Sequence, residues 1–175
     1  MMLPVAPPDP RALPRTSLST ISVEHIRIDS IKSYAETRAA LERLPHFDDR
    51  TRTLMQYGDI AKVRSALGEI QGDAGLVVFS VATHGDWLQI ISGKRNVVQY
   101  VIGNVLVSTQ MTQHELAAAL YAPLRIVVYE NESGAATIEY DRPSTLFGQF
   151  GNERVTAVAR DLDEKIQDIL IRAAT

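Results

Sequence analysis

The sequence predicts an α+β fold: a single domain with a mainly antiparallel sheet of about five strands and helices packed on it. Short segments rich in β-branched residues, separated by glycine and asparagine, are typical of strands. Apolar residues that recur every three or four positions predict helices between and after these segments. The length of 175 residues fits one domain. We expect this domain to span residues 21–175.

The first strand and the first helix are predicted at the start of this domain. Residues 21–28 are rich in Ile and Val, which favours a strand. Ser33 and Glu36 form a capping-box pattern, in which each side chain can satisfy a backbone N–H of the other residue. The helix is expected to stop at Pro45, because proline lacks the N–H that a helix interior needs. Residues 46–58 are expected to form a loop.

An extra helix is predicted near residues 59–70. Asp59 can cap its first turn, and apolar residues follow at helical spacing. Residues 76–83 form a nearly continuous apolar run, which is expected of a strand buried on both faces.

Residues 87–91 and 96–103 predict the next two strands, joined as a hairpin. Gly93 suits the first central position of a two-residue type II′ turn between them. That turn would set Trp87 opposite Tyr100. Such a cross-strand aromatic pair contributes about 0.2–1 kcal/mol relative to a pair of alanines.

The second half of the chain predicts a short helix, a second hairpin and a long terminal helix. Asn104 is a good N-cap for a helix through about His114. Residues 124–130 and 135–141 predict the two hairpin strands. From Asn152 onward, the apolar stripe is typical of an amphipathic helix that packs on the sheet.

Two registers compete for the second hairpin. A four-residue loop would pair Arg125 with Tyr140. A three-residue loop, with Gly134 in the left-handed conformation, would set Arg125 opposite Asp141. The second register is favoured because it sorts the apolar side chains onto one face, and a slip by one residue would undo that sorting. The residues sorted onto this face are Ile126, Val128, Ile138 and Tyr140.

The composition argues against several classes of function. A net charge of −3 without a basic tail argues against nucleic-acid binding, which depends on cations that meet phosphates. The chain has no cysteine, so disulfides and thiolate chemistry are excluded and a cytoplasmic location is expected. No apolar run reaches the length of about 20 residues that a membrane helix needs. The four histidines are scattered, so we predict no metal site and no cofactor.

The first 20 residues are set apart from the domain. Residues 1–20 contain five of the eight prolines in the chain. Proline removes backbone donors and favours extended, polyproline-type backbone. We therefore expect a flexible, proline-rich N-terminal arm.

A mixed polar and apolar corner is the best candidate for a binding site. Beyond residue 139 the last hairpin strand leaves through charged residues and enters an apolar segment that contains Phe147. Arg125 beside Asp141 would present a planar guanidinium that can bind two oxygens of a carboxylate or phosphate. The structural alternative is a plain surface ion pair. The candidate ligand-binding residues are His84, Tyr100, Asn104, Tyr121, Arg125, Tyr140, Asp141 and Phe147.

We expect these residues to form a pocket for a small anionic ligand, without catalysis, roofed by the segment around Phe147. Two other classes stay open. An enzyme would use His84 with Asp86 as an acid–base pair near Tyr100 or Tyr121. The sequence does not assign a catalytic role to any residue. A homodimer would place the 144–150 segment in a two-fold interface.

Three stretches resemble a bacterial and archaeal family known as domain of unknown function family 302. They are residues 98–104, 120–125 and 140–144. The likeness runs from about residue 22 to the C-terminus and includes the turn at His84 and the terminal helix. The resemblance implies a β-α-β4-α type of α+β fold. It implies no activity, because the family has no established one.

Overall fold

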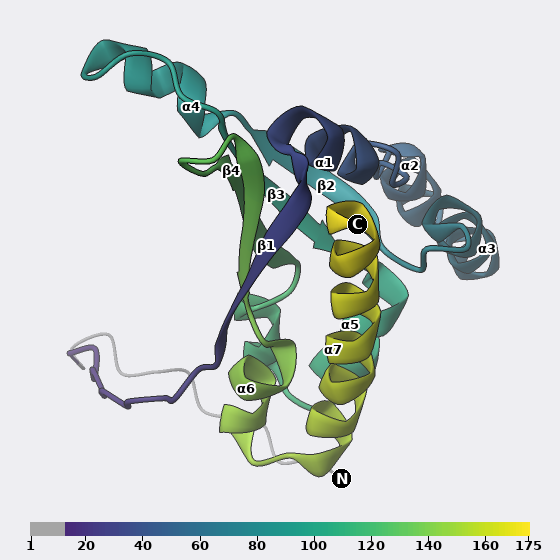
Figure 1. The fold of residues 1–175 in the computed structure, drawn as a ribbon. Helices are drawn as coiled ribbons and strands as arrows, with labels where there is room; N and C mark the ends of the chain where they lie inside the picture. The colour runs from purple at the N-terminus through teal and green to yellow at the C-terminus, as the bar shows by residue number, and fades with distance from the viewer. Residues whose placement is uncertain (1–12) are drawn as a thin grey trace, which may run out of the picture.

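The computed structural model describes residues 13–175, and its centre is a five-stranded sheet in the order β1-β5-β4-β3-β2. The strands are β1 (His25–Ser33), β2 (Val77–Ala82), β3 (Val97–Gly103), β4 (Leu124–Glu130) and β5 (Ala135–Asp141). Every neighbouring pair is antiparallel. Together with the helices around the sheet (Figure 1), this arrangement confirms the predicted single-domain α+β class.

Helices cover one face of the sheet. Figure 1 shows α1, α5 and α7 on the same side of the strands. The α-helices are α1 (Tyr34–Leu41), α2 (Arg50–Gln56), α3 (Ile60–Gln71), α4 (His84–Trp87), α5 (Val105–Thr112), α6 (Pro143–Phe147) and α7 (Glu153–Ala174). Three short 3-10 helices complete the described chain: η1 (Leu88–Ile90), η2 (Leu116–Leu120) and η3 (Gly148–Phe150).

The core lies between the sheet and α7. Side chains that lie opposite one another in antiparallel strands share a face of the sheet. Two such rows of the covered face are buried, and α7 packs its own apolar stripe against them. The residues of the rows are Tyr100, Ile126, Tyr140, Val98, Val128 and Ile138. The fully buried residues of α7 include Val155, Ala159, Ile166 and Leu170.

The β4–β5 hairpin has the register that the sequence favours. Ile126 pairs with Tyr140, and the N–H of Asn131 donates to the carbonyl oxygen of Ala135 at 2.9 Å. Gly134 closes the turn with a φ of +81°, a conformation that favours glycine. The sorting of apolar residues onto one face is therefore confirmed.

The helix starts also follow the sequence. Ser33 and Glu36 form the predicted capping box before α1. Asp59, Asn104 and Asn152 each accept a backbone N–H in the first turn of α3, α5 and α7. The extra helix predicted near 59–70 is α3.

Two expectations in the first half of the chain are wrong. Residues 46–58 are not only a loop, because they contain α2. This helix has no side-chain N-cap hydrogen bond, so the sequence lacks the usual signal for its start. The run at 76–83 contains β2, which is an edge strand and not a strand buried on both faces. Ser80 and Val81 of β2 are exposed.

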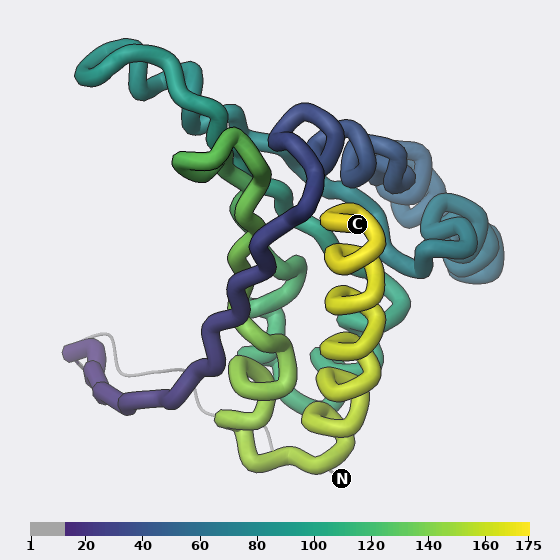
Figure 2. The backbone as a smooth tube through the Cα atoms, viewed as in Figure 1, coloured from purple at the N-terminus to yellow at the C-terminus, as the bar shows by residue number. Residues whose placement is uncertain are grey.

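Residues 84–96 form a helical arm that projects from the sheet (Figure 2). The expected strand at 87–91 is wrong, because β3 already has β2 along one edge and β4 along the other. β3 therefore has no free edge for residues 87–91, which form the end of α4, η1 and the start of a turn. Tyr100 faces residues of β2 and β4, so the pair of Trp87 with Tyr100 does not form.

Gly85 closes the base of the helical arm. Its carbonyl oxygen accepts the N–H of Arg95 at 3.4 Å. A Cβ atom at this position would lie 1.8 Å from the carbonyl oxygen of Arg95, so only glycine permits this approach. Gly93, with a φ of +90°, lies at the far end of the arm and serves a chain reversal there, not the expected hairpin turn.

The predicted N-terminal arm lies mostly outside the described residues. Residues 1–12 are not described, and residues 13–20 are exposed and contain no helix or strand. The first strand begins at His25, later than the expected residue 21.

Candidate functional site

Three of the predicted site residues lie in the core and do not line a pocket at the Arg125 corner. Tyr100 and Phe147 are fully buried, and Tyr140 is nearly so. Tyr100 and Tyr140 belong to the covered face of the sheet because each lies opposite Ile126. Phe147 ends α6 and packs inward. Its side chain therefore forms neither the expected roof of the pocket nor a two-fold contact.

Asn104 and Tyr121 have structural roles at the end of the sheet where β3 ends and β4 begins. Asn104 accepts the N–H of Val107 at the start of α5 and donates its Nδ2 to the carbonyl oxygen of Gly75 at 2.7 Å. The ring of Tyr121 lies 6.2 Å from that of Phe147, edge to face. Asn104 and Phe147 border a small apolar hollow of about 170 Å³.

Arg125 and Asp141 share a face of the sheet, but the expected ion pair does not form. Asp141 instead lies opposite His25 of β1, and its Oδ1 lies 2.9 Å from Nδ1 of His25. Among the described residues, no carboxylate lies within ion-pair distance of Arg125, and none of the main hollows includes Arg125 or Asp141. The sequence could not show this, because β1 joins β5 from 116 positions away.

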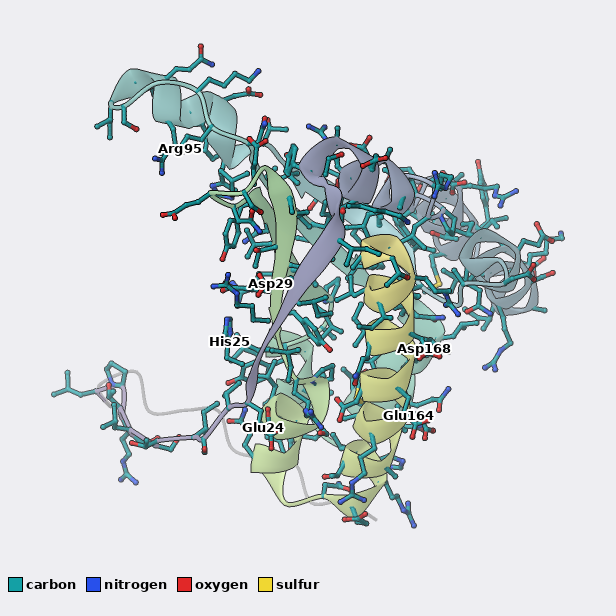
Figure 3. The ribbon with its side chains drawn as sticks, viewed as in Figure 1. Glu24, His25, Asp29, Arg95, Glu164 and Asp168 are labelled. Carbon is teal, nitrogen blue, oxygen red and sulfur yellow. The ribbon has the colours of Figure 1, made fainter. Side chains whose placement is uncertain are left out.

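The open face of the sheet, opposite the helices, carries a continuous polar cluster. Its members come from β1, β4 and β5 and point to the side away from α7, as Figure 3 shows for His25 and Asp29. We call this set the open-face cluster: His25, Arg27, Asp29, Tyr129, Thr137, Glu139 and Asp141.

The open-face cluster is linked by short hydrogen bonds. Nε2 of His25 lies 2.9 Å from Oε2 of Glu139, and the Tyr129 hydroxyl donates to the other oxygen of Glu139 at 2.6 Å. Farther along β1, Arg27 donates to Asp29 at 3.0 Å. Because alternate residues of β1 contribute, the polar and apolar alternation over residues 25–29 was the signal that sequence reasoning missed.

These contacts shift the ionisation of the cluster. The hydrogen bond to Asp141, and then that to Glu139, raise the pKa of the His25 imidazole above its ordinary value. Hydrogen bonds from Tyr129 and then His25 lower the pKa of Glu139. The bond to Glu139 also raises the pKa of the Tyr129 hydroxyl. The cluster therefore holds Glu139 ionised and favours a protonated His25.

A large hollow opens between the helical arm and the tip of the β4–β5 hairpin. Its volume is about 1140 Å³, and we call it the arm hollow. Its cationic lining residues are Arg27, Lys94 and Arg95, and its amide and hydroxyl groups come from Asn96, Asn131, Tyr129 and Ser133. Its acidic lining residues are Asp29, Glu130 and Glu132.

Most charges around the arm hollow are already paired. Lys94 lies 2.9 Å from Asp86, and Asn96 donates to Glu130 at 2.8 Å. Arg27 is held by Asp29. Among the described residues, Arg95 has no carboxylate within ion-pair distance, so its guanidinium is the cation available to a ligand.

The residues of the enzyme alternative do not converge. His84 lies at the base of the helical arm, and Asp86 is engaged by Lys94. Tyr100 is buried on the covered face of the sheet. No group of three or more histidine, aspartate or glutamate side chains within residues 13–175 is arranged to hold a metal ion. Over the same residues, no helix is both long and apolar enough to cross a membrane.

The fold and the open face define a small α+β domain with one helix-covered and one polar sheet face. The chain belongs to the family described as Domain of unknown function DUF302, whose match spans residues 51–173. A solved structure with the same fold is the uncharacterized conserved protein DUF302 from Bacillus stearothermophilus. It is 17% identical, with a TM-score of 0.60 over 86% of this chain and 98% of that chain. Comparison with curated proteins gave no match.

Proposed function

We propose that this domain binds a small anionic ligand in the arm hollow, without catalysing a reaction. The observation that carries the proposal is Arg95, which borders the hollow without a carboxylate partner among the described residues. Arginine presents several N–H donors in one plane, which suits the paired oxygens of a carboxylate or phosphate. The proposal keeps the predicted ligand class and moves the site from the Arg125 corner to the arm.

The surroundings of Arg95 support an oriented ligand. Asn131 lines the side of the hollow that faces the arm, and its amide has a second N–H that can donate to a polar ligand, whereas the Tyr129 hydroxyl already donates to Glu139. Glu132 lies on the hairpin tip and would repel an anion. The anionic group is therefore expected on the arm side, next to Arg95, with any neutral polar group toward the hairpin.

Trp87 is the single tryptophan of the chain and lies in the helical arm, so its fluorescence can report binding. The probes are inorganic phosphate, pyrophosphate and citrate, titrated at fixed protein concentration. We expect saturable binding of at least one probe. Arg95→Ala should weaken it about tenfold or more, because a hydrogen bond to a charged group contributes about 1.5–3 kcal/mol.

Two variants test the location of the site. Arg125→Ala removes an exposed arginine of the open sheet face that does not line the arm hollow, so this variant should bind like the wild type. Glu132→Gln should bind more tightly, because it removes a repelling charge. The proposal is wrong if Arg95→Ala binds every probe as the wild type does. It is also wrong if no probe saturates and native mass spectrometry finds no co-purified small molecule.

The cellular location stays a prediction. A chain without cysteine is compatible with a reducing compartment, which is why we expect the cytoplasm. Localising the tagged, full-length chain by fractionation would test this expectation directly.

A further inference from the structure

We infer that a hollow among α2, α3 and α5 binds the anion of a medium-chain fatty acid, with the carboxylate at Arg64 and the alkyl chain inside. The volume of this hollow is about 410 Å³, and we call it the helix hollow. None of its lining residues also lines the arm hollow, so the inference concerns a second site and does not depend on the anion proposed there.

Three helices and the segment before α2 form the helix hollow. α2 and α3 lie side by side beyond α1 (Figure 1), and α3 also contacts α5. Phe47 precedes α2, and its N–H donates to the carbonyl oxygen of Val78 at 2.9 Å. The ring of Phe47 stacks on that of Phe79 with 4.8 Å between the centroids. One wall of the hollow is therefore attached to β2.

The lining of the helix hollow is mainly apolar. Met55 is 53% exposed and Ile60 is 56% exposed, so both present apolar surface that a ligand can cover. The volume lies in the lower part of the range of about 300–1,000 Å³ that is typical of small-molecule pockets, which suits a chain of medium length. The apolar lining residues are Phe47, Met55, Ile60, Val63, Leu67, Val105 and Leu106.

Two arginines, Arg52 and Arg64, are the charged residues of this lining, and no acidic residue in the described part of the chain belongs to it. Arg64 has no carboxylate within ion-pair distance among residues 13–175, whereas Arg52 lies 3.5 Å from the exposed Asp49. Residues three and four apart are neighbours on a helix, so Arg64 shares a face of α3 with Ile60 and Leu67. The structure thus places an available guanidinium beside an apolar hollow.

The charge of the lining selects among apolar ligands. A cationic amphiphile would be repelled by both arginines, and a neutral one would make no use of them. A guanidinium can bind both oxygens of a carboxylate through parallel hydrogen bonds. A carboxylate with one alkyl chain therefore matches both parts of the helix hollow.

The first test titrates the full chain with hexanoate, octanoate and decanoate below their micelle concentrations, by isothermal calorimetry. The dissociation constant should fall by up to about fourfold for each added methylene, because each one removes apolar surface from water. Octanol, which lacks the charge, should bind about tenfold more weakly than octanoate. Arg64→Ala should remove most of this preference. The control Arg172→Ala, which removes an exposed arginine of α7 outside the hollow, should retain it.

The second test locates the ligand by NMR of isotope-labelled methionine methyl groups. Met55 lines the helix hollow, whereas Met111 is buried and borders a different hollow. Octanoate should shift the Met55 signal, assigned by its absence in Met55→Leu, and should leave the Met111 signal in place. Ile60→Asp adds a repelling charge to the wall and should abolish the shift with an unchanged circular dichroism spectrum. Leu116→Asp, at an exposed apolar site in η2, should not.

Several results would overturn the inference. They are the absence of binding for all three carboxylates, equal binding of octanol and octanoate, unchanged octanoate binding in Arg64→Ala, and a shift of the Met111 signal without that of Met55. Two further results would assign the hollow to another occupant. A dimer that Ile60→Asp converts to a monomer would indicate a second copy, and binding to vesicles of anionic phospholipid without binding of monomeric octanoate would indicate a membrane.

The two proposed sites can fail independently of each other. Arg95→Ala should leave octanoate binding unchanged, because Arg95 does not line the helix hollow. Arg64→Ala should leave the binding of phosphate and pyrophosphate unchanged, because Arg64 does not line the arm hollow. Loss of octanoate binding in Arg95→Ala would contradict the inference, whereas unchanged phosphate binding in Arg95→Ala would contradict the arm hollow alone.

Discussion

The Nδ1 atom of His25 lies 2.9 Å from Oδ1 of Asp141, across the pairing of β1 with β5. The other ring nitrogen lies at the same distance from Glu139. An imidazole between two carboxylates favours its protonated form. This contact links the edge strand of the sheet to the last hairpin and replaces the ion pair that Arg125 was expected to make.

His25 should make the stability of the protein depend on pH. Its pKa is raised in the folded state. The stabilisation that His25 contributes is therefore complete below the pKa of His25 in the unfolded state, which is about 6.5. This stabilisation is lost as the pH rises through the higher pKa of His25 in the folded state. The difference in unfolding free energy between wild type and His25→Gln should be about 1 kcal/mol or less at low pH, because the side chain is 57% exposed, and should vanish at high pH.

The same contact can be followed in the folded state by NMR. Titration of the His25 ring proton, assigned by its absence in His25→Gln, should give a pKa above 6.5. Asp141→Asn should lower it more than Glu139→Gln, because the bond to Asp141 contributes the larger shift. Equal pKa values in the wild type and in Asp141→Asn would contradict the contact.

Gly85→Ala should open the base of the helical arm. The added Cβ would overlap the carbonyl oxygen of Arg95, so the backbone must move. We expect a loss of about 1–3 kcal/mol, as for other overpacked sites, measured by urea unfolding. Gly68→Ala is the matched control, since a Cβ there meets nothing within 4 Å. It should stabilise α3 by about 0.5–1 kcal/mol. A neutral Gly85→Ala would refute the close approach.

Much of the fold follows from local patterns in the sequence. The register of β4 and β5 was predictable because Ile126 and Tyr140 can share the covered face only if Gly134 closes a three-residue loop. The helical arm was not predictable in this way. Residues 87–91 look like a strand, and only the long-range pairing of β2 with β3 excludes them from the sheet.

The candidate site was less predictable than the fold, for the same reason. Asp141 could be matched with Arg125 from the hairpin alone, but its partner His25 comes from a strand at the other end of the chain. Tyr100 and Phe147 were expected in a pocket, but their rings fill the core. The chemistry of the open face depends on which strands are neighbours, and local patterns do not specify that order.

Tyr100→Phe should stabilise the protein. The Tyr100 hydroxyl is buried and makes no hydrogen bond of good geometry among the described residues. Burial raises its pKa to about 12, although the nearby Arg38 guanidinium acts in the opposite direction. An unsatisfied buried polar group costs about 1–3 kcal/mol, so its removal should raise the unfolding free energy by about 1 kcal/mol. Tyr129→Phe is the control with the opposite sign, because it removes the bond to Glu139. A destabilised Tyr100→Phe would mean that the hydroxyl has a partner.

Asn104 offers a test of capping against ligand contact. Its Oδ1 accepts the N–H of Val107 at 3.2 Å, and its Nδ2 donates to the carbonyl oxygen of Gly75 at 2.7 Å. Asn104→Ser keeps an oxygen that can cap α5 and loses the donor to Gly75 and Gln71, whereas Asn104→Ala loses both. Loss of a cap costs about 0.5–2 kcal/mol, so the alanine variant should be the less stable of the two in urea unfolding. Probe binding in the arm hollow should be unchanged in both, because Asn104 does not line that hollow. Weakened binding in these variants at unchanged stability would instead assign Asn104 to the ligand.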